Sequence, residues 1–246
     1  MNDKKKNPIL LARFEPFHSF EELVNAVGNL FKEPSSSNIY LTVPFSFVEP
    51  FAKHMKEATL GVESLIDTHP EKFTSTIATR MLSERNVQFV LIGTANERKF
   101  HQNNPALLHE KLDRVLSSTI TPIVCVGETW IEFCDGLSKE VIKKQLTELI
   151  GDLPKKTLKG LHIVYEAPWI LETPWEANNE HLLKAYEQFN EVVNELSTST
   201  TKFKLLYSVP AYSEDLKQIM ENLPADGYLI GIFNGSAAET SRVCSL

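Results

Sequence analysis

Glycine is scarce in this chain: ten glycines occur in 246 residues, about 4% against a typical figure near 7%. A backbone that approaches a phosphate group closely usually does so at glycine, because glycine has no side chain to intrude. The low glycine content therefore argues against a protein that cradles phosphate in several glycine-rich loops.

Cysteine is equally sparse, and its pattern excludes two classes of site. Cys125, Cys134 and Cys244 are odd in number and lack the Cys-x-x-Cys spacing. Neither a disulfide framework nor a structural zinc site is indicated. We expect no metal and no cofactor.

The chain also lacks a net positive charge and long apolar runs. The net charge is −7 and the only basic run, residues 4–6, has the character of a solvated terminus, so we expect no nucleic-acid partner. The longest apolar runs are too short to span a bilayer, and no apolar segment of signal-peptide length follows the first residues. We therefore expect a cytoplasmic protein without a membrane partner.

What the chain does have is a regular alternation of short β-rich runs and longer amphipathic runs. The expected strands are 8–14, 38–43, 58–62, 88–93, 121–126, 161–166, 203–209 and 228–231. The expected helices are 20–32, 45–56, 75–84, 105–117, 138–150, 179–196 and 213–222, with a last helix at 235–246. Such alternation predicts βαβ units and a parallel sheet. Eight units without a linker favour one α/β domain over residues 1–246, a closed (β/α)₈ barrel; an open doubly wound sheet is the alternative.

Three segments resemble one family in order and spacing. They are 88–99, which ends Gly-Thr-Ala-Asn-Glu-Arg-Lys; 122–129, Pro-Ile-Val-Cys-Val-Gly-Glu-Thr; and 164–169, Val-Tyr-Glu-Ala-Pro-Trp. The chain resembles the triosephosphate isomerase family from about residue 8 to residue 234. The resemblance implies a TIM barrel, and an enzyme of glycolysis that interconverts dihydroxyacetone phosphate and glyceraldehyde 3-phosphate.

The resemblance implies one retained catalytic group and two replaced ones. Glu166 stands at the position of the family's catalytic base. Glu15 stands where the family has a lysine, which reverses the charge, and Thr94 stands where it has the histidine electrophile. The family's glutamate in the fourth segment corresponds to Asn96 or Glu97, and both pairings stay open. His101 is expected at the surface.

The phosphate-binding positions are also altered. By the resemblance, substrate would be bound around Arg13, Ser208, Gly231 and Ile232, but the family's glycine pairs are replaced by Tyr-Ser-Val-Pro at 207–210 and by Gly-Ile at 231–232. The sixth loop, 169–175, carries Pro and Trp where the family has hinge glycines, which predicts a stiffer loop.

Arg13 and Glu15 are two residues apart on a strand, so their side chains point to the same face. Two carboxylates at one barrel rim repel each other unless a cation lies between them. We therefore predict that Arg13 pairs with Glu15 or Glu166.

Segment 66–76 keeps the length of the family's third loop, with Phe73 as an apolar anchor and Thr74 at the family's threonine. In the family this loop docks against a second subunit, so the resemblance implies a homodimer.

Three functions stay open. The first is a family member whose isomerase chemistry is lost or severely reduced, a possible pseudoenzyme. The second is a functional triosephosphate isomerase with a rearranged site. The third is a barrel that uses the Glu15 and Glu166 carboxylates on a cationic or neutral substrate.

Overall fold

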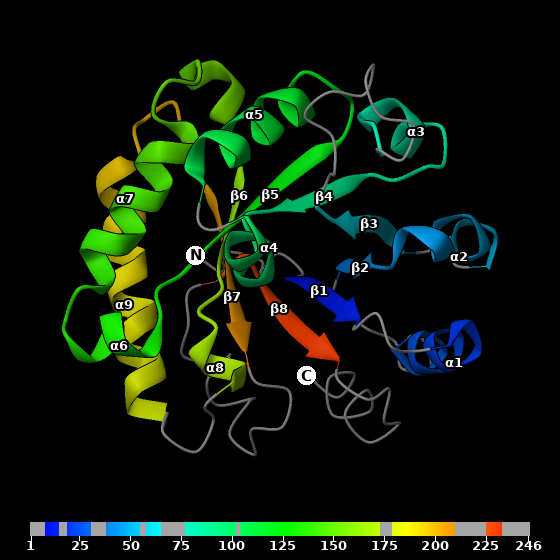
Figure 1. The fold of residues 1–246 in the computed structure, drawn as a ribbon, viewed down its shortest axis with the longest axis horizontal. Helices are drawn as coiled ribbons and strands as arrows, with labels where there is room; N and C mark the ends of the chain where they lie inside the picture. Colours follow the sequence, from blue (N-terminus) through cyan, green and yellow to red (C-terminus); the bar gives the residue numbers. More distant parts are fainter. Residues whose placement is uncertain are drawn as a thin grey trace, which may run out of the picture.

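The computed structural model describes residues 8–14, 19–30, 38–54, 58–64, 77–101, 104–172, 179–209 and 225–232. Eight parallel strands form a closed barrel in the order β1-β2-β3-β4-β5-β6-β7-β8, with β8 hydrogen-bonded back to β1. The strands are β1 (Ile9–Phe14), β2 (Asn38–Thr42), β3 (Thr59–Glu63), β4 (Phe89–Ile92), β5 (Thr121–Val126), β6 (His162–Tyr165), β7 (Lys204–Val209) and β8 (Gly227–Ile232). The barrel prediction is confirmed, and the open sheet is excluded (Figure 1).

Helices surround the barrel (Figure 1). They are α1 (Phe20–Leu30), α2 (Val48–His54) after the 3₁₀ turn η1 (Phe45–Phe47), α3 (Thr79–Ser83), α4 (Ala95–Phe100), α5 (Pro105–Leu116), α6 (Trp130–Cys134), α7 (Ser138–Ile150), η2 (Lys155–Leu158), α8 (Trp169–Glu172) and α9 (Asn179–Leu196). The long helices α5, α7 and α9 agree closely with expectation. The helices expected at 213–222 and 235–246 lie outside the described residues.

Three short helices were not predicted, and one expected helix is shorter. The spacing at 75–84 suggested a longer helix than α3, which begins only after an extended Ala78. The unpredicted helices α4, α6 and α8 all follow strands closely, within segments expected to be loops. Thr94-x-x-Glu97 and Thr129-x-x-Glu132 are helix-start signals of the capping-box kind. In α6 the complete reciprocal box is present.

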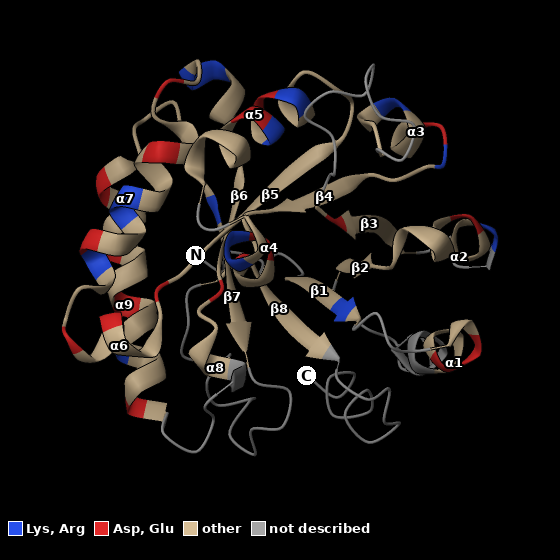
Figure 2. Cartoon of the chain, viewed as in Figure 1, with Lys and Arg blue, Asp and Glu red and all other residues tan. Residues whose placement is uncertain are grey.

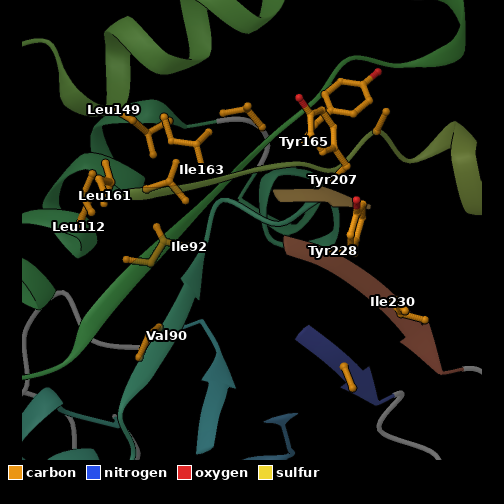
Figure 3. Packing of buried hydrophobic residues seen from close by; sticks show 14 of the residues in the cluster. Val90, Ile92, Leu112, Leu149, Leu161, Ile163, Tyr165, Tyr207, Tyr228 and Ile230 are labelled. Carbon is orange, nitrogen blue, oxygen red and sulfur yellow. The ribbon is translucent and has the colours of Figure 1, made fainter. Parts of the chain in front are cut away.

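The core has two layers, because alternate residues of each strand face opposite sides of the sheet. One layer lies between the strands and the helices, and Figure 3 shows part of it, with Leu112 and Leu149 from helices and Val90, Ile92 and Ile163 from strands. Charged residues lie mainly on the outer helices (Figure 2). Among the described residues, no helix is long and apolar enough to cross a membrane.

The second layer fills the inside of the barrel. Its buried members are Ile9, Leu11, Phe89, Leu91, Ile123, Cys125, Val164, Leu206 and Leu229. Phe89 reaches across to Gly61, where an added Cβ would overlap the phenylalanine ring. The inside of the barrel is therefore a packed core, and a site can form only at one of its ends.

His162 closes the end of the barrel opposite the carboxyl ends of the strands. It precedes the inward-facing Val164 by two residues and is only 6% exposed, and within the described part of the chain neither ring nitrogen has a hydrogen-bond partner. Burial, aided by the charge of Lys204, lowers the pKa of His162 to about 4. The ring is therefore held neutral.

This histidine makes stability depend on pH. The unfolded chain binds a proton at His162 below about pH 6.5, whereas the folded chain resists protonation down to about pH 4. The free energy of unfolding should therefore fall as the pH drops from about 6.5 towards 4, by about 1–2 kcal/mol at pH 5 from this group. Urea denaturation at pH 7.5 and pH 5 checks this. In His162→Leu the loss between the two pH values should shrink by that amount, and an unchanged loss would contradict the assignment.

Candidate site at the mouth of the barrel

The carboxyl ends of the strands carry a small set of polar side chains that face the barrel axis. Arg13, Glu166 and Ser208 each lie two residues beyond an inner-core residue, namely Leu11, Val164 and Leu206. The strand period of two therefore turns their side chains towards the mouth. Active sites of barrel enzymes lie at this end.

Arg13 and Glu166 form a buried ion pair across this mouth. Nη1 of Arg13 donates a hydrogen bond to Oε1 of Glu166, and the two side chains are 7% and 3% exposed. Burial alone would lower the pKa of Arg13, but the carboxylates of Glu166 and Glu63 outweigh it and raise that pKa. The predicted pairing of Arg13 with Glu166 is present, and Glu15 lies outside the described residues.

The second oxygen of Glu166 is engaged as well. Oε2 accepts a hydrogen bond from the backbone N–H of Ala95, at 3.0 Å. The carboxylate is thus held between a guanidinium on one side and the first turn of α4 on the other. Both of its oxygens accept hydrogen bonds, so the carboxylate is held in one orientation.

Thr94, at the family's histidine position, is fully buried and belongs to the helix start. Its hydroxyl oxygen accepts from the N–H of Glu97 at 3.3 Å and caps α4. The same hydroxyl donates its only proton to Oε1 of Glu63, at 2.7 Å.

Glu63 is a site residue that the sequence reasoning missed. It is the last residue of β3, and the expected strand ended one residue earlier, at 62. Burial raises the pKa of Glu63, although Arg13 acts in the opposite direction. The alternation of side chains along the strand could have predicted its position. Gly61 faces the inside of the barrel, and Glu63, two residues further along the strand, faces the same side.

Arg98 ties together the strand ends that carry the site. Its guanidinium donates to the carbonyl oxygens of Gly93, Cys125, Gly127 and Glu166, the last three at 3.1, 3.1 and 3.3 Å. A Cβ on Gly127 would clash with the backbone of Glu166. The ends of β4, β5 and β6 are thus fixed relative to one another.

Glu97 and Asn96 have different environments. Glu97 is buried, and its carboxylate accepts hydrogen bonds from Lys111 Nζ at 2.6 Å and from the Ser64 hydroxyl. The same carboxylate accepts a hydrogen bond from the N–H of Gly93 at 2.7 Å. Asn96 is exposed. The histidine expected at the surface nearby is partly exposed. His101 has a side chain only 21% exposed and lies 3.0 Å from Lys111 Nζ, because it packs against this buried ion pair.

The remaining predicted site residues are only partly brought together. Gly231 is buried and lies beside Arg13 in the β1–β8 register. Ser208 is 1% exposed, and its Oγ has no hydrogen-bond partner among the described residues. Ile232 ends β8, and nothing is described of its side chain. Phe73, Thr74 and Pro210 lie outside the described ranges.

The start of the sixth loop is helical, since residues 169–172 form α8. Trp169 is buried there, against Phe133 at 5.0 Å between ring centroids. Nearby, Glu128 accepts a hydrogen bond from the Tyr165 hydroxyl at 2.7 Å. Burial raises the pKa of the Glu128 carboxyl group. Within the described ranges, no group of three or more His, Cys, Asp or Glu side chains is placed to hold a metal ion.

A closed parallel (β/α)₈ barrel with its polar side chains at the carboxyl ends of the strands defines a TIM-barrel protein. A family model described as triosephosphate isomerase matches residues 13–246. The chain therefore belongs to the triosephosphate isomerase family, as a divergent member.

Its relatives are distant but cover most of the chain. It is 26% identical over 203 residues to the triosephosphate isomerase of Protochlamydia amoebophila (strain UWE25), with 81% of this chain and 77% of the relative covered. It is 27% identical over 201 residues to that of Lawsonia intracellularis (strain PHE/MN1-00), with 80% of each covered. The protein of Dictyoglomus thermophilum (strain ATCC 35947 / DSM 3960 / H-6-12) is 24% identical over 215 residues, with 86% of each covered.

The Arg13–Glu166 pair gives a test by stability. Arg13→Met leaves a buried carboxylate without its cation, so the free energy of unfolding should fall by about 3–5 kcal/mol. The double variant Arg13→Met/Glu166→Gln should lose less than Arg13→Met alone, because no unpaired charge remains. Lys53→Met, which breaks the exposed Lys53–Glu49 pair, is the matched control and should cost much less than Arg13→Met. Equal losses at positions 13 and 53 in urea denaturation would refute the structural role of the buried pair.

Proposed function

We propose that this chain is a triosephosphate isomerase-family barrel in which the interconversion of dihydroxyacetone phosphate and glyceraldehyde 3-phosphate is lost or severely reduced. That reaction needs a carboxylate free to remove a weakly acidic C–H proton, a donor to stabilise the enediolate oxygens, and a grip on the phosphate. Each requirement can be compared with a described contact at the mouth.

The observation that carries the proposal is the engagement of both oxygens of Glu166. One accepts from Arg13 and the other from the N–H of Ala95. The two hydrogen bonds hold the carboxylate in one orientation, between a side chain of β1 and the first turn of α4. The two donors also restrict the directions from which a substrate C–H group could approach either oxygen.

The electrophile position supports the same proposal. The Thr94 hydroxyl has a single proton, and that proton is donated to Glu63. It therefore has none to donate to a developing enediolate oxygen. Backbone and side-chain donors of this kind typically contribute about 10²–10³ in rate.

The position of Arg13 argues against phosphate binding on one side of the mouth. In the closed strand order β7 and β8 lie between β6 and β1, and Arg13 joins β1 to Glu166 just after β6. The pair therefore runs past the ends of the two strands where the family's phosphate loops begin. The chain's Gly231-Ile232 and Ser208 stand there in place of glycine pairs.

We further propose that residues 1–246 form one domain and that the protein is a cytoplasmic homodimer. Phe100, at the end of α4, is 83% exposed, with its ring 5.1 Å from that of His101. We propose that this exposed ring takes part in the contact between the two subunits. The expected partner loop, 66–76, lies outside the described residues.

We expect no isomerase activity above background. A coupled assay on highly purified protein, made without added metal, should give the same rate for the wild-type chain and for Glu166→Gln, because the base, electrophile and phosphate grip are all compromised. Circular dichroism of both proteins confirms that each is folded. Turnover that disappears in Glu166→Gln would overturn the proposal and establish the alternative, an active glycolytic isomerase with a rearranged site.

Sedimentation velocity tests the dimer. The wild-type chain should sediment as a dimer at micromolar concentration, and Phe100→Glu should weaken self-association at least tenfold because it places a charge in the apolar contact. Lys99→Glu, a charge change at the neighbouring exposed position, is the control and should have a smaller effect. A wild-type monomer, or a dimer indifferent to Phe100→Glu, would count against this interface.

A further inference from the structure

A cavity of about 550 Å³ lies between α4, α5 and α7, beside the turn that follows β5. Its volume is within the range of small-molecule sites in proteins, about 300–1,000 Å³. Its described lining includes none of the four polar residues that the mouth presents, Arg13, Glu63, Glu166 and Ser208. The cavity is therefore a second space, separate from the mouth.

Side-chain hydrogen bonds hold the wall of this cavity beside β5. Gln145, in α7, accepts from the N–H of Gly127 at 3.0 Å and donates to the carbonyl oxygen of Gly127 at 3.1 Å. Arg98, in α4, donates to the same oxygen at 3.1 Å. All three residues line the cavity. Because this wall is fixed before any ligand arrives, binding does not have to supply the cost of ordering it.

Aliphatic side chains form another part of the lining. Pro105 and Leu108 come from α5, Val141 and Leu149 from α7, and Pro168 follows β6. Burial of apolar surface against such side chains is favourable by about 25 cal/mol per Å². The lining therefore favours a ligand with an apolar body.

A buried hydrogen-bond donor belongs to the same lining. Arg98 is only 7% exposed. Its two terminal nitrogens make the four hydrogen bonds to carbonyl oxygens described above, and its Nε–H has no partner among the described residues. A guanidinium offers donors only. A ligand atom that completes the hydrogen bonds of Arg98 must therefore be an acceptor.

The charges around the cavity favour an anion. Three cations line it, Arg98, Lys99 and Lys144, together with two carboxylates, Glu132 and Glu148, so the net charge is +1 when all are ionised. Neither Arg98 nor Lys99 has an ion pair with any described residue. A cation without a counter-ion in a partly enclosed space attracts an anion more strongly than it does in bulk water.

The two carboxylates of the lining already have partners. Glu132 accepts from the N–H and from the hydroxyl of Thr129, at 2.7 and 2.8 Å. Glu148 lies 4.0 Å from Nζ of Lys144. The positive charge that remains for a ligand is therefore on α4.

Two further carboxylates act on Arg98 without lining the cavity. Glu166 is paired with Arg13. Burial raises the pKa of Glu128, which favours the neutral form of that group. Neither of them supplies a full negative charge to compensate Arg98.

We propose that the cavity between α4, α5 and α7 binds a small organic carboxylate with an apolar body. The carboxylate lies towards Arg98 and Lys99, and the apolar body lies against the aliphatic side chains of α5 and α7. A monoanion matches the net charge of +1 better than a phosphate group, which carries almost two negative charges at neutral pH.

Three probes separate the contributions of charge and apolar body: naphthylacetate, its neutral amide naphthylacetamide, and acetate. Binding is followed by NMR titration of the full chain at pH 7.5. Naphthylacetate should bind at least about tenfold more tightly than the amide, which lacks the charge, and than acetate, which lacks the apolar body. Inorganic phosphate should bind more weakly than naphthylacetate.

Variants then locate the ligand. Lys99→Gln/Lys144→Gln removes two positive charges from the lining and should weaken naphthylacetate binding at least about tenfold. Val141→Trp places a large ring in the cavity from a half-buried position of α7 and should abolish binding. Lys53→Gln, which removes an exposed charge from α2, is the control and should leave binding unchanged. Circular dichroism confirms that each variant is folded.

Four results would each overturn the inference: absence of naphthylacetate binding, equal binding of the acid and the amide, tighter binding of phosphate, or undiminished binding in the folded Val141→Trp variant. The last result would assign the anion to another place, such as the mouth. The isomerase assay with Glu166→Gln is independent of these titrations, because Glu166 does not line the cavity.

Discussion

The guanidinium of Arg98 joins the carboxyl ends of three neighbouring strands of the barrel. Arg98 leaves α4 and donates to four carbonyl oxygens at the ends of β4, β5 and β6. Burial lowers the pKa of Arg98, with Glu166 acting in the opposite direction, so the cation is balanced by backbone dipoles and nearby carboxylates rather than by a direct ion pair. Because Arg98 fixes the backbone of Glu166 and the turn at Gly93, it also fixes the N–H of Ala95 that binds the Glu166 carboxylate. The positions of the Glu166 carboxylate and of its backbone donor therefore follow from this arrangement.

The strands were predictable because their apolar runs are short and regularly spaced, and because a closed sheet buries both faces. The Arg13–Glu166 pair was also predictable, since strand period placed Arg13 inward and two rim carboxylates required a cation. The strand prediction depends only on local pattern. The prediction of the pair also uses the resemblance, which placed Glu15 and Glu166 at the rim of the barrel.

Other parts of the site could not be predicted as easily. Glu63 joins the mouth through a hydrogen bond with Thr94, 31 residues away, and a strand boundary misplaced by one residue removed it from consideration. His101 contacts Lys111, which reaches it from the next helix. Such contacts are set by tertiary packing, and a single sequence carries little trace of them.

The ring of Phe89 occupies the space that the absent side chain of Gly61 leaves inside the barrel. Consequently neither position can change freely. A larger residue at 61 becomes tolerable only after 89 has become smaller, and a smaller residue at 89 leaves a void until 61 has grown. The two sites are thus epistatic, and a lineage that departs from this pairing must pass through a destabilised intermediate or change both residues together.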